Sequence, residues 1–493
     1  MSASKGARAD ATGPKVGEIV GRLELEKAWL VDPVSGREGP GEIVVIDGVL
    51  ESVVWLKGHE AAGVTDRGVV VAPGFFDLHA HFREPGFEDA ETVATGSAAA
   101  AHGGYTTVAV MPNTQPALDD PGVLARIQAA ARASGSPVEV LAFGAVSAGR
   151  AGEQLSAMGE LADAGVIGYS DDGSPVKTPK LLRSALLYAG MLGLPIVDHA
   201  EDAELTSGAE AHEGYMASVM GLAGWPTSAE VNAVSRDLAV LADALLDEPR
   251  ARLHLTHIST AAALDLVRRA KAAGLPVTCD VTPHHLALTE EWIAGARRWS
   301  WEALAADGTS RDPWADAALT AWPYNTSLRV NPPLATATDA AACLAALLDG
   351  TADAVATDHA PHTVVDKEVE FGRAANGISG IETALGVLLA LVDAGKLPLA
   401  RAVAALTTGP AGVLAAALGS AAVPATRARG LIEGAPANLV VFDRGDTWKV
   451  TPEALLSKGK NSPLLGRELP GRVLLTIAAG RLAYEDPQAG DAE

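Results

Sequence analysis

The sequence contains very little cysteine and no long apolar run. Its two cysteines, Cys279 and Cys343, do not form a C-x-x-C pair and are too few for a disulfide framework. We therefore expect reduced thiols and a cytoplasmic protein. No apolar stretch approaches the roughly 18 residues that a membrane span needs, and residues 1–16 are polar, without the apolar core of a signal peptide. We expect a flexible tail at 1–16 and no membrane association.

Positive charge is also scarce. The chain has 38 Lys and Arg residues against 61 Asp and Glu residues, and its formal net charge is -23. Such a surface repels the phosphate backbone, so we expect no nucleic-acid partner. If the substrate is a small anion, its site must supply local positive charge from arginine, imidazole or metal. With 48% hydrophobic residues among 493, the chain is typical of a large globular protein.

From residue 69 onward, short apolar runs alternate with alanine- and leucine-rich helical segments. Eight candidate strands begin at residues 69, 105, 138, 164, 194, 252, 275 and 352. Five of them follow a glycine that we interpret as a left-handed helix C-cap. Eight such units are typical of an α/β fold of the TIM (β/α)8 barrel type. A doubly wound sheet is the alternative, but no G-x-G-x-x-G follows the first strand.

Segments rich in short strand patterns flank the predicted barrel. Residues 17–68 and 428–485 both have this character, and we expect them to pair into one small β-sandwich domain. The barrel domain would then span 69–427, and 486–493 would be a second tail. Two connections, 202–250 and 286–336, are unusually long. Five of the nine tryptophans lie at 292–322, which indicates either a lid or subunit contact, or a packed satellite cluster.

Histidines and aspartates occur at the ends of several predicted strands. His79 and His81 are two residues apart in the first strand, so both project to the same side. An isolated pair of this kind commonly makes only ordinary hydrogen bonds. Further potential ligands end four other strands, where a barrel carries its active site: Asp172, His199, His257 and Asp358. Six ligands without a thiolate favour two metal ions over one structural zinc, and therefore hydrolysis.

Other polar residues nearby suit an anionic substrate. The guanidinium of Arg83 could donate two parallel hydrogen bonds to a carboxylate, and His362 could complete an anion pocket. Asn113 and Asn331 lie beside prolines and could contact the substrate. The alternatives are a surface salt bridge for the arginine and turn-forming roles for the asparagines. His284 and His285 follow the seventh strand, where one of them could donate to the substrate or orient a ligand.

In their order along the chain, these segments resemble the amidohydrolase superfamily and, within it, the class I bacterial dihydroorotases. The motifs are PGFFDLHAHFREPG, GGYTTVAVMPNTQP, GYSDDGSPV, VDHAED, HIST, VTPHHLALTE, RVNPPL and ATDHAPH. The resemblance is close over about residues 70–390 and weaker in EGAPANLVVFD and NSPLLG. It implies a zinc-dependent enzyme that reversibly hydrolyses the cyclic amide of dihydroorotate to carbamoyl-aspartate in pyrimidine biosynthesis.

The resemblance also implies a role for each matching residue. His79, His81 and Asp358 would hold one zinc ion, His199 and His257 would hold a second, and Asp172 would bridge the two. Asp358 would in addition carry a proton to the departing amide nitrogen. The substrate contacts would be Arg83, Asn113, Asn331, His362, Asn376 and Gly377. We expect a homo-oligomer, and some members of the family point to aspartate transcarbamoylase as a candidate partner.

One motif departs from the family pattern. Residues 375–377 read Ala-Asn-Gly where the family usually has Pro-Phe-Gly, and this resembles the hydantoinase branch. Hydrolysis of another cyclic ureide, such as hydantoin or allantoin, therefore stays an alternative. Hydantoinases generally bridge their metals with a carboxylated lysine, whereas the fourth strand here ends in SDDG. A catalytically silent scaffold for aspartate transcarbamoylase is a third interpretation, which the intact ligand positions and Arg83 disfavour.

Overall fold

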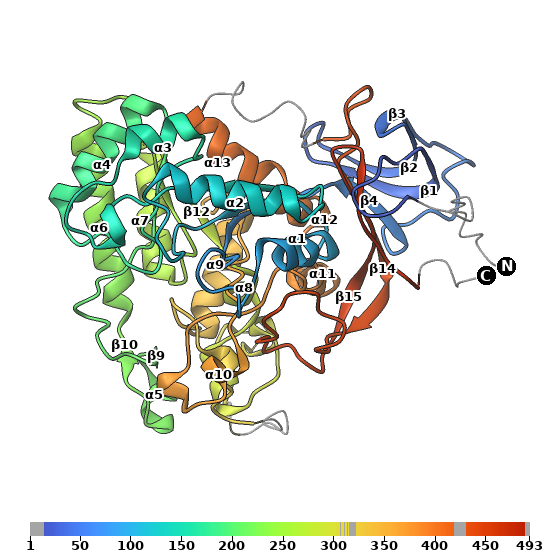
Figure 1. The fold of residues 1–493 in the computed structure, drawn as a ribbon. Coiled ribbons are helices and arrows are strands. Elements are labelled where there is room, and N and C mark those ends of the chain that lie inside the picture. The colour runs from blue at the N-terminus through green and yellow to red at the C-terminus, as the bar shows by residue number, and fades with distance from the viewer. Residues whose placement is uncertain are drawn as a thin grey trace.

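The computed structural model describes residues 14–305, 307–309, 311–312, 314, 322–418 and 430–488. Figure 1 shows an α/β part with helices around short strands, and beside it a sheet built from blue N-terminal and red C-terminal strands. The predicted α/β class is confirmed. Among the described residues, no helix is long and apolar enough to cross a membrane.

The α/β part contains two parallel sheets. One consists of β5 (Phe75–Ala80), β6 (Tyr105–Val110) and β7 (Glu139–Ala142). The other consists of β8 (Ile196–Asp198), β11 (Leu253–Leu255), β12 (Val277–Val281) and β13 (Ala354–Val355). Single parallel bridges connect them: Gly144 with Tyr169, Tyr169 with Ile196, and Ala80 with His359. The predicted fourth strand thus consists of one bridging residue, Tyr169.

Helices follow these strands in the alternating order that the sequence predicts. The longer ones are α1 (Val93–His102), α2 (Pro121–Ala133), α3 (Met158–Ala164), α4 (Pro179–Leu192), α6 (Thr227–Ala244), α7 (Ala261–Ala272), α9 (Ala337–Asp349), α11 (Ala384–Asp393), α12 (Leu399–Leu406) and α13 (Thr408–Leu418). Three short ones are α5 (Tyr215–Met220), α8 (Pro283–Ala287) and α10 (Val364–Lys367). Two-residue strands β9 (Ala211–His212) and β10 (Gly224–Trp225) lie in the long connection after β8. The glycines expected before five strands all have positive φ.

The two terminal segments contribute strands to one seven-stranded sheet. Its order is β16-β15-β14-β4-β1-β2-β3. The N-terminal members are β1 (Arg22–Asp32), β2 (Arg37–Ile46), β3 (Val49–Trp55) and β4 (Val69–Pro73). The C-terminal members are β14 (Leu439–Lys449), β15 (Glu468–Ala478) and β16 (Arg481–Glu485). Bonds outside the ladder also join the two terminal segments: Leu50 donates to the Ala435 carbonyl (2.9 Å) and Val20 to the Gly480 carbonyl (3.0 Å).

The predicted first barrel strand, from Val69 to His81, is wrong as a single element. It divides at Gly74 into β4, which belongs to the seven-stranded sheet, and β5, which belongs to the parallel part. Gly74 donates to the Asn438 carbonyl (2.9 Å), and a Cβ there would lie 2.3 Å from Thr106 Cγ2. The change of sheet therefore falls within one apolar run, about five residues after the boundary expected at 68/69. The boundary expected at 427/428 lies outside the described residues.

The tryptophans of the second long connection divide into two groups. Trp292 and Trp299 are buried in one apolar cluster, and Trp301 stacks on Trp299 with ring centroids 5.2 Å apart. Trp314 and Trp322 are 42% and 82% exposed. The packed satellite cluster is confirmed for the first three residues, and a lid or subunit contact stays a prediction for the other two.

The buried carboxylate of Glu91 joins the segment between β14 and β15 to the α/β part. It accepts hydrogen bonds from Ser457 Oγ (2.6 Å) and the Lys458 amide (3.2 Å), and its Oε2 lies 3.5 Å from His359 Nε2. Burial raises the pKa of this carboxyl, but the nearby His359 ring and the hydrogen bonds from Ser457 and Thr95 outweigh burial and lower the pKa below its usual value. The folded protein therefore favours the ionised form.

We expect Glu91→Gln to destabilise the protein by about 2 kcal/mol at neutral pH, since hydrogen bonds to a charged group are lost. The pKa of Glu91 is lower in the folded state than in the unfolded state, where it is near 4.5. Ionised Glu91 therefore stabilises the folded protein above pH 4.5, and this stabilisation is lost as the pH falls from 4.5 through the folded-state pKa. The gap in thermal midpoint between wild type and variant should thus narrow from pH 7 to pH 4. Exposed Glu368→Gln is the control, and a gap independent of pH would contradict the assignment.

Candidate active site

Six buried side chains meet at the carboxyl ends of the parallel strands. His79 lies in β5 and His81 directly after it, while the other four follow Tyr169, β8, β11 and β13 in turn: Asp172, His199, His257 and Asp358. Each is less than 9% exposed. Parallel strands deliver their ends to one side of a sheet, so residues far apart in the chain become neighbours there.

His79, His81 and Asp358 form the first group of potential ligands. The two Nε2 atoms of the histidines are 3.2 Å apart. Asp358 Oδ1 lies 3.1 Å from His81 Nε2 and 3.5 Å from His79 Nε2. Ligand atoms around a tetrahedral zinc ion are about 3.3 Å apart, given bonds of about 2.0–2.1 Å. The spacing of these three atoms therefore fits one ion.

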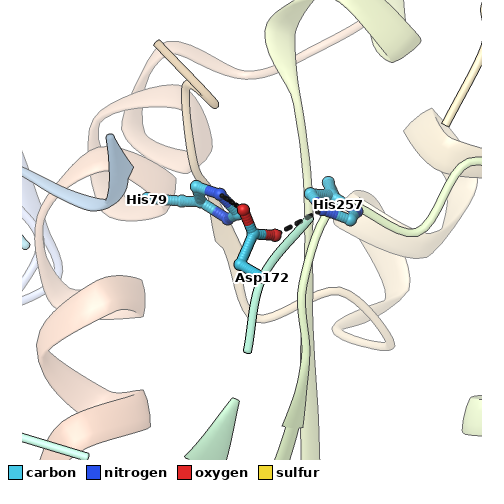
Figure 2. A group of neighbouring side chains, drawn as sticks. All are labelled: His79, Asp172 and His257. Carbon is cyan, nitrogen blue, oxygen red and sulfur yellow. Dashed lines mark hydrogen bonds and ion pairs between the residues drawn. The ribbon is translucent and has the colours of Figure 1, made fainter. Parts of the chain in front are cut away.

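Asp172 lies between this group and a second one. Its Oδ2 is 3.3 Å from His79 Nε2, and its Oδ1 is 3.3 Å from His257 Nε2 and 3.5 Å from His199 Nδ1. Figure 2 shows the carboxylate between His79 and His257, with one oxygen facing each ring. His199 Nδ1 and His257 Nε2 are 2.9 Å apart. One carboxylate thus reaches both groups, which is the geometry a bridging ligand needs.

Each of three histidines has a polar partner at its outer ring nitrogen. His79 Nδ1 lies 2.7 Å from Thr256 Oγ1, His81 Nδ1 lies 2.9 Å from Asn113 Oδ1, and His199 Nε2 lies 2.7 Å from Glu201 Oε2. An oxygen that accepts from the outer nitrogen leaves the lone pair of the inner nitrogen facing the site, as metal-binding histidines require.

The carboxylates give this site a strong preference for positive charge. Burial lowers the pKa of His79, but Asp172 and Asp358 outweigh it and raise the pKa to about 9. Burial likewise lowers the pKa of His199, but Asp172 and Glu201 raise it to about 10. Burial raises the pKa of Asp172, but His79, His199 and His257 together lower it well below its usual value. Protons and metal cations therefore compete for the same rings.

Arg83 and His362 lie together beside the first group. Arg83 Nη2 is 3.2 Å from His362 Nε2, and Arg83 Nε donates to the Pro361 carbonyl (3.1 Å). His362 Nε2 also lies 2.8 Å from the Asn376 carbonyl. Burial lowers the pKa of Arg83 to about 10 and that of His362 to about 3. At neutral pH the arginine is therefore a cation beside a neutral imidazole.

Two further predicted substrate residues, Asn113 and Asn331, lie beside different groups of potential metal ligands. Asn113 contacts His81, as described above, whereas Asn331 Nδ2 donates to Glu201 Oε2 (2.7 Å) and lies 3.3 Å from His199 Nε2. Asn331, Glu201 and the exposed Asn376 also line a small pocket of about 90 Å³. Gly377 has φ +147°, and a Cβ there would lie 2.5 Å from the Ala360 carbonyl oxygen.

Three residues of this arrangement were missed by the sequence analysis: Glu201, Thr256 and Asp280. Asp280 Oδ1 accepts from the His257 amide (2.6 Å), and Thr256 Oγ1 lies 3.4 Å from the same oxygen. Glu201 lies two residues after the predicted ligand His199, and this spacing is a usable signal, because side chains two apart in an extended segment share a side. Thr256 is directly adjacent to His257, so the same rule does not identify it. Asp280 lies in a different strand and gives no such signal.

His284 and His285 are both buried near the site. His285 Nδ1 lies 2.8 Å from Thr282 Oγ1, and its Nε2 lies 3.1 Å from the Pro332 carbonyl, so both nitrogens have structural partners. Burial lowers the pKa of His284 to about 4, and this ring is therefore neutral at pH 7. No described residue bonds to its Nε2 atom.

Comparison with known proteins extends these observations. The dihydro-orotase-like family matches residues 68–262. A dihydroorotase from Anaeromyxobacter dehalogenans is 43% identical over 469 residues, covering 95% of this chain and 99% of the relative. One from Pelotomaculum thermopropionicum is 40% identical over 94% of this chain and 99% of its own length. Among solved structures, L-hydantoinase from Arthrobacter aurescens has TM-score 0.73 and 24% identity, with coverage of 94% and 96%, and shares the fold.

Proposed function

The chain belongs to the dihydroorotase family, and from this premise we propose that it reversibly hydrolyses dihydroorotate to carbamoyl-aspartate in pyrimidine biosynthesis. The observation that carries the proposal is the position of Asp172. Its two oxygens face two groups of histidines, and the Arg83–His362 pair lies beside one of those groups. A cyclic amide that bears a carboxylate needs both features, one for hydrolysis and one for recognition.

We propose that the two groups hold two zinc ions. His79, His81 and Asp358 would bind one, His199 and His257 the other, and Asp172 both. The histidine and carboxylate donors, their burial and their spacing fit zinc. Bound zinc would supply a nucleophile at neutral pH and polarise the amide carbonyl.

Asp358 is the residue that we assign to proton transfer. It is buried beside His81, and although burial raises the pKa of its carboxyl, the hydrogen bond from His81 and the charge of His79 lower that pKa well below its usual value. An ionised carboxylate at this place accepts the proton that the attacking water loses, and passes it to the amide nitrogen as the ring opens.

The substrate carboxylate would bind at Arg83. A guanidinium offers two parallel donors to a carboxylate, and we assign His362, which lies beside Arg83, to the same part of the pocket. We further assign Asn113, Asn331, Asn376 and Gly377 to the pocket around the ring. The Asn376 side chain accepts from Arg329 Nε (3.0 Å), and the Gly377 amide donates to the Arg329 carbonyl (2.9 Å), so Arg329 holds this part of the pocket wall in place.

Three further proposals concern architecture and assembly. The bridge between Ala80 and His359 links the first parallel strand to the end of the last, and supports closure of the eight segments into a TIM barrel. The bonds between the N- and C-terminal segments support a composite β-sandwich domain. A cytoplasmic homo-oligomer, with aspartate transcarbamoylase as a candidate partner, stays a prediction.

Turnover of three ring substrates tests the proposed function. The zinc-loaded protein should hydrolyse dihydroorotate faster than hydantoin or allantoin, and should close carbamoyl-aspartate in the reverse direction. The Ala-Asn-Gly sequence at 375–377 makes a hydantoinase the second candidate. Turnover of hydantoin without turnover of dihydroorotate would establish that alternative and remove the first.

Arg83→Met should weaken substrate binding more than it slows chemistry. Loss of charge-assisted hydrogen bonds to the carboxylate predicts a KM for dihydroorotate about 10- to 100-fold higher, with a smaller change in kcat and an unchanged zinc content. The control is Arg373→Met, whose side chain is 80% exposed. Steady-state kinetics in both directions measure the effect, and an Arg83 variant with wild-type KM would exclude the assigned contact.

A further inference from the structure

Residues 457–461, in the segment between β14 and β15, lie against the proposed substrate pocket. Ser457 and Lys458 are fixed at Glu91, as described above. Gly459 packs so closely that a Cβ there would lie 2.6 Å from Pro361 Cβ and 2.8 Å from the His362 amide nitrogen. The pocket loop that carries His362 is therefore covered from outside by a segment about 100 residues further along the chain.

The segment ends at Asn461, whose side chain is buried and fully hydrogen-bonded. Its Oδ1 accepts from the His362 amide (2.9 Å) and lies 2.9 Å from Ser379 Oγ. Its Nδ2 donates to the carbonyls of Ala360 (3.1 Å) and Gly377 (2.9 Å). Asn461 is only 6% exposed. A primary amide has two donors and two acceptor sites, so this side chain uses all of them.

Three of these contacts connect the two loops beside the proposed substrate pocket. Ala360 and His362 belong to the loop after β13, and Gly377 belongs to the segment that carries Asn376. The distance between His362 Nε2 and the Asn376 carbonyl, 2.8 Å, depends on how these loops lie. So does the 3.2 Å distance between Arg83 Nη2 and His362 Nε2. Buried hydrogen bonds of this kind fix the groups that bind a ligand.

We propose that Asn461 is a positioning residue of the substrate pocket, which holds the His362 loop and the 376–377 segment in place beside Arg83, where the substrate carboxylate would bind. The inference rests on the proposed function, because it is the carboxylate of the ring that these groups would bind. Asn461 bonds to the pocket loops and to none of the six proposed metal ligands, so its effect falls on binding rather than on zinc.

The test uses the full-length, zinc-loaded chain and three variants. Asn461→Ala removes all four bonds, and Asn461→Asp keeps the accepting oxygens but loses both donations. Ser457→Ala loosens the same segment at Glu91 and leaves the bonds to Ala360, His362 and Gly377 intact. For both Asn461 variants we expect the KM for dihydroorotate to rise about 10-fold or more, kcat to change less, and the zinc-to-protein ratio to match the wild type. For Ser457→Ala we expect a lower thermal midpoint with wild-type KM.

The outcomes separate this role from the proposed function. If the wild type hydrolyses dihydroorotate and an Asn461 variant keeps its KM, the positioning role is wrong and the proposed function stands. An equal KM increase in Ser457→Ala would assign the effect to general loosening and also overturn it. A wild type that opens hydantoin but not dihydroorotate overturns both proposals. If the alanine variant does not fold, the aspartate variant decides.

Discussion

Asp358→Asn should lower kcat for dihydroorotate by about 100- to 10,000-fold, the range that a positioned general acid–base residue contributes. The substitution keeps the size and shape of the side chain, so packing around β13 should change little. It removes the negative charge beside His79 and His81 and the oxygen that accepts the proton. Both directions of the reaction should slow together, because the same residue would move the proton each way.

Kinetics with measured zinc content and thermal midpoint distinguish this role from damage to the fold. Glu368→Gln, an exposed carboxylate ten residues further along the chain, provides the matched control and should behave as the wild type. Near-wild-type turnover by Asp358→Asn would refute the assignment. A variant that loses both zinc and activity would leave Asp358 as a metal ligand and remove the evidence for a separate role in proton transfer.

Local rules were sufficient to predict where the ligand-type side chains lie. His79 and His81 could be placed on one side because strand residues two apart share a side. The others could be placed because each ends a predicted strand, and parallel strands end together. Tyr169 shows how little regular structure this needs: the predicted fourth strand is one bridging residue, yet Asp172 still reaches the common site.

The contacts that required the structure are those between segments distant in sequence. Gly74 lies within a continuous apolar run, and only the tertiary contact with Asn438 and Thr106 reveals that the chain changes sheets there. Asn461 begins the NSPLLG segment of the family resemblance, but its role required the structure, because its partners lie about 80 to 100 residues away. Hydrogen-bond partners at such separations follow from how loops pack, which periodicity and spacing do not encode.

Asp172 differs from Asp358 in what its removal should do first. Asp172 faces four histidines, two on each side, whereas Asp358 faces only the first group. Without Asp172, the rings lose the carboxylate that chiefly raises the pKa of His79 and helps raise that of His199. The effect should therefore appear in metal occupancy before it appears in any step of catalysis.

We expect Asp172→Ala to lower the zinc-to-protein ratio by about one ion per chain. Both groups lose a shared ligand, and the group of His199 and His257 keeps fewer ligands, so it should lose its ion. Turnover should fall by at least about 100-fold. Metal analysis after dialysis measures the first effect, with exposed Asp163→Ala as control. An unchanged ratio would contradict bridging. Wild-type protein that cannot bind zinc at all would instead favour a silent scaffold, and four buried histidines placed around one carboxylate would then be without a metal-binding role.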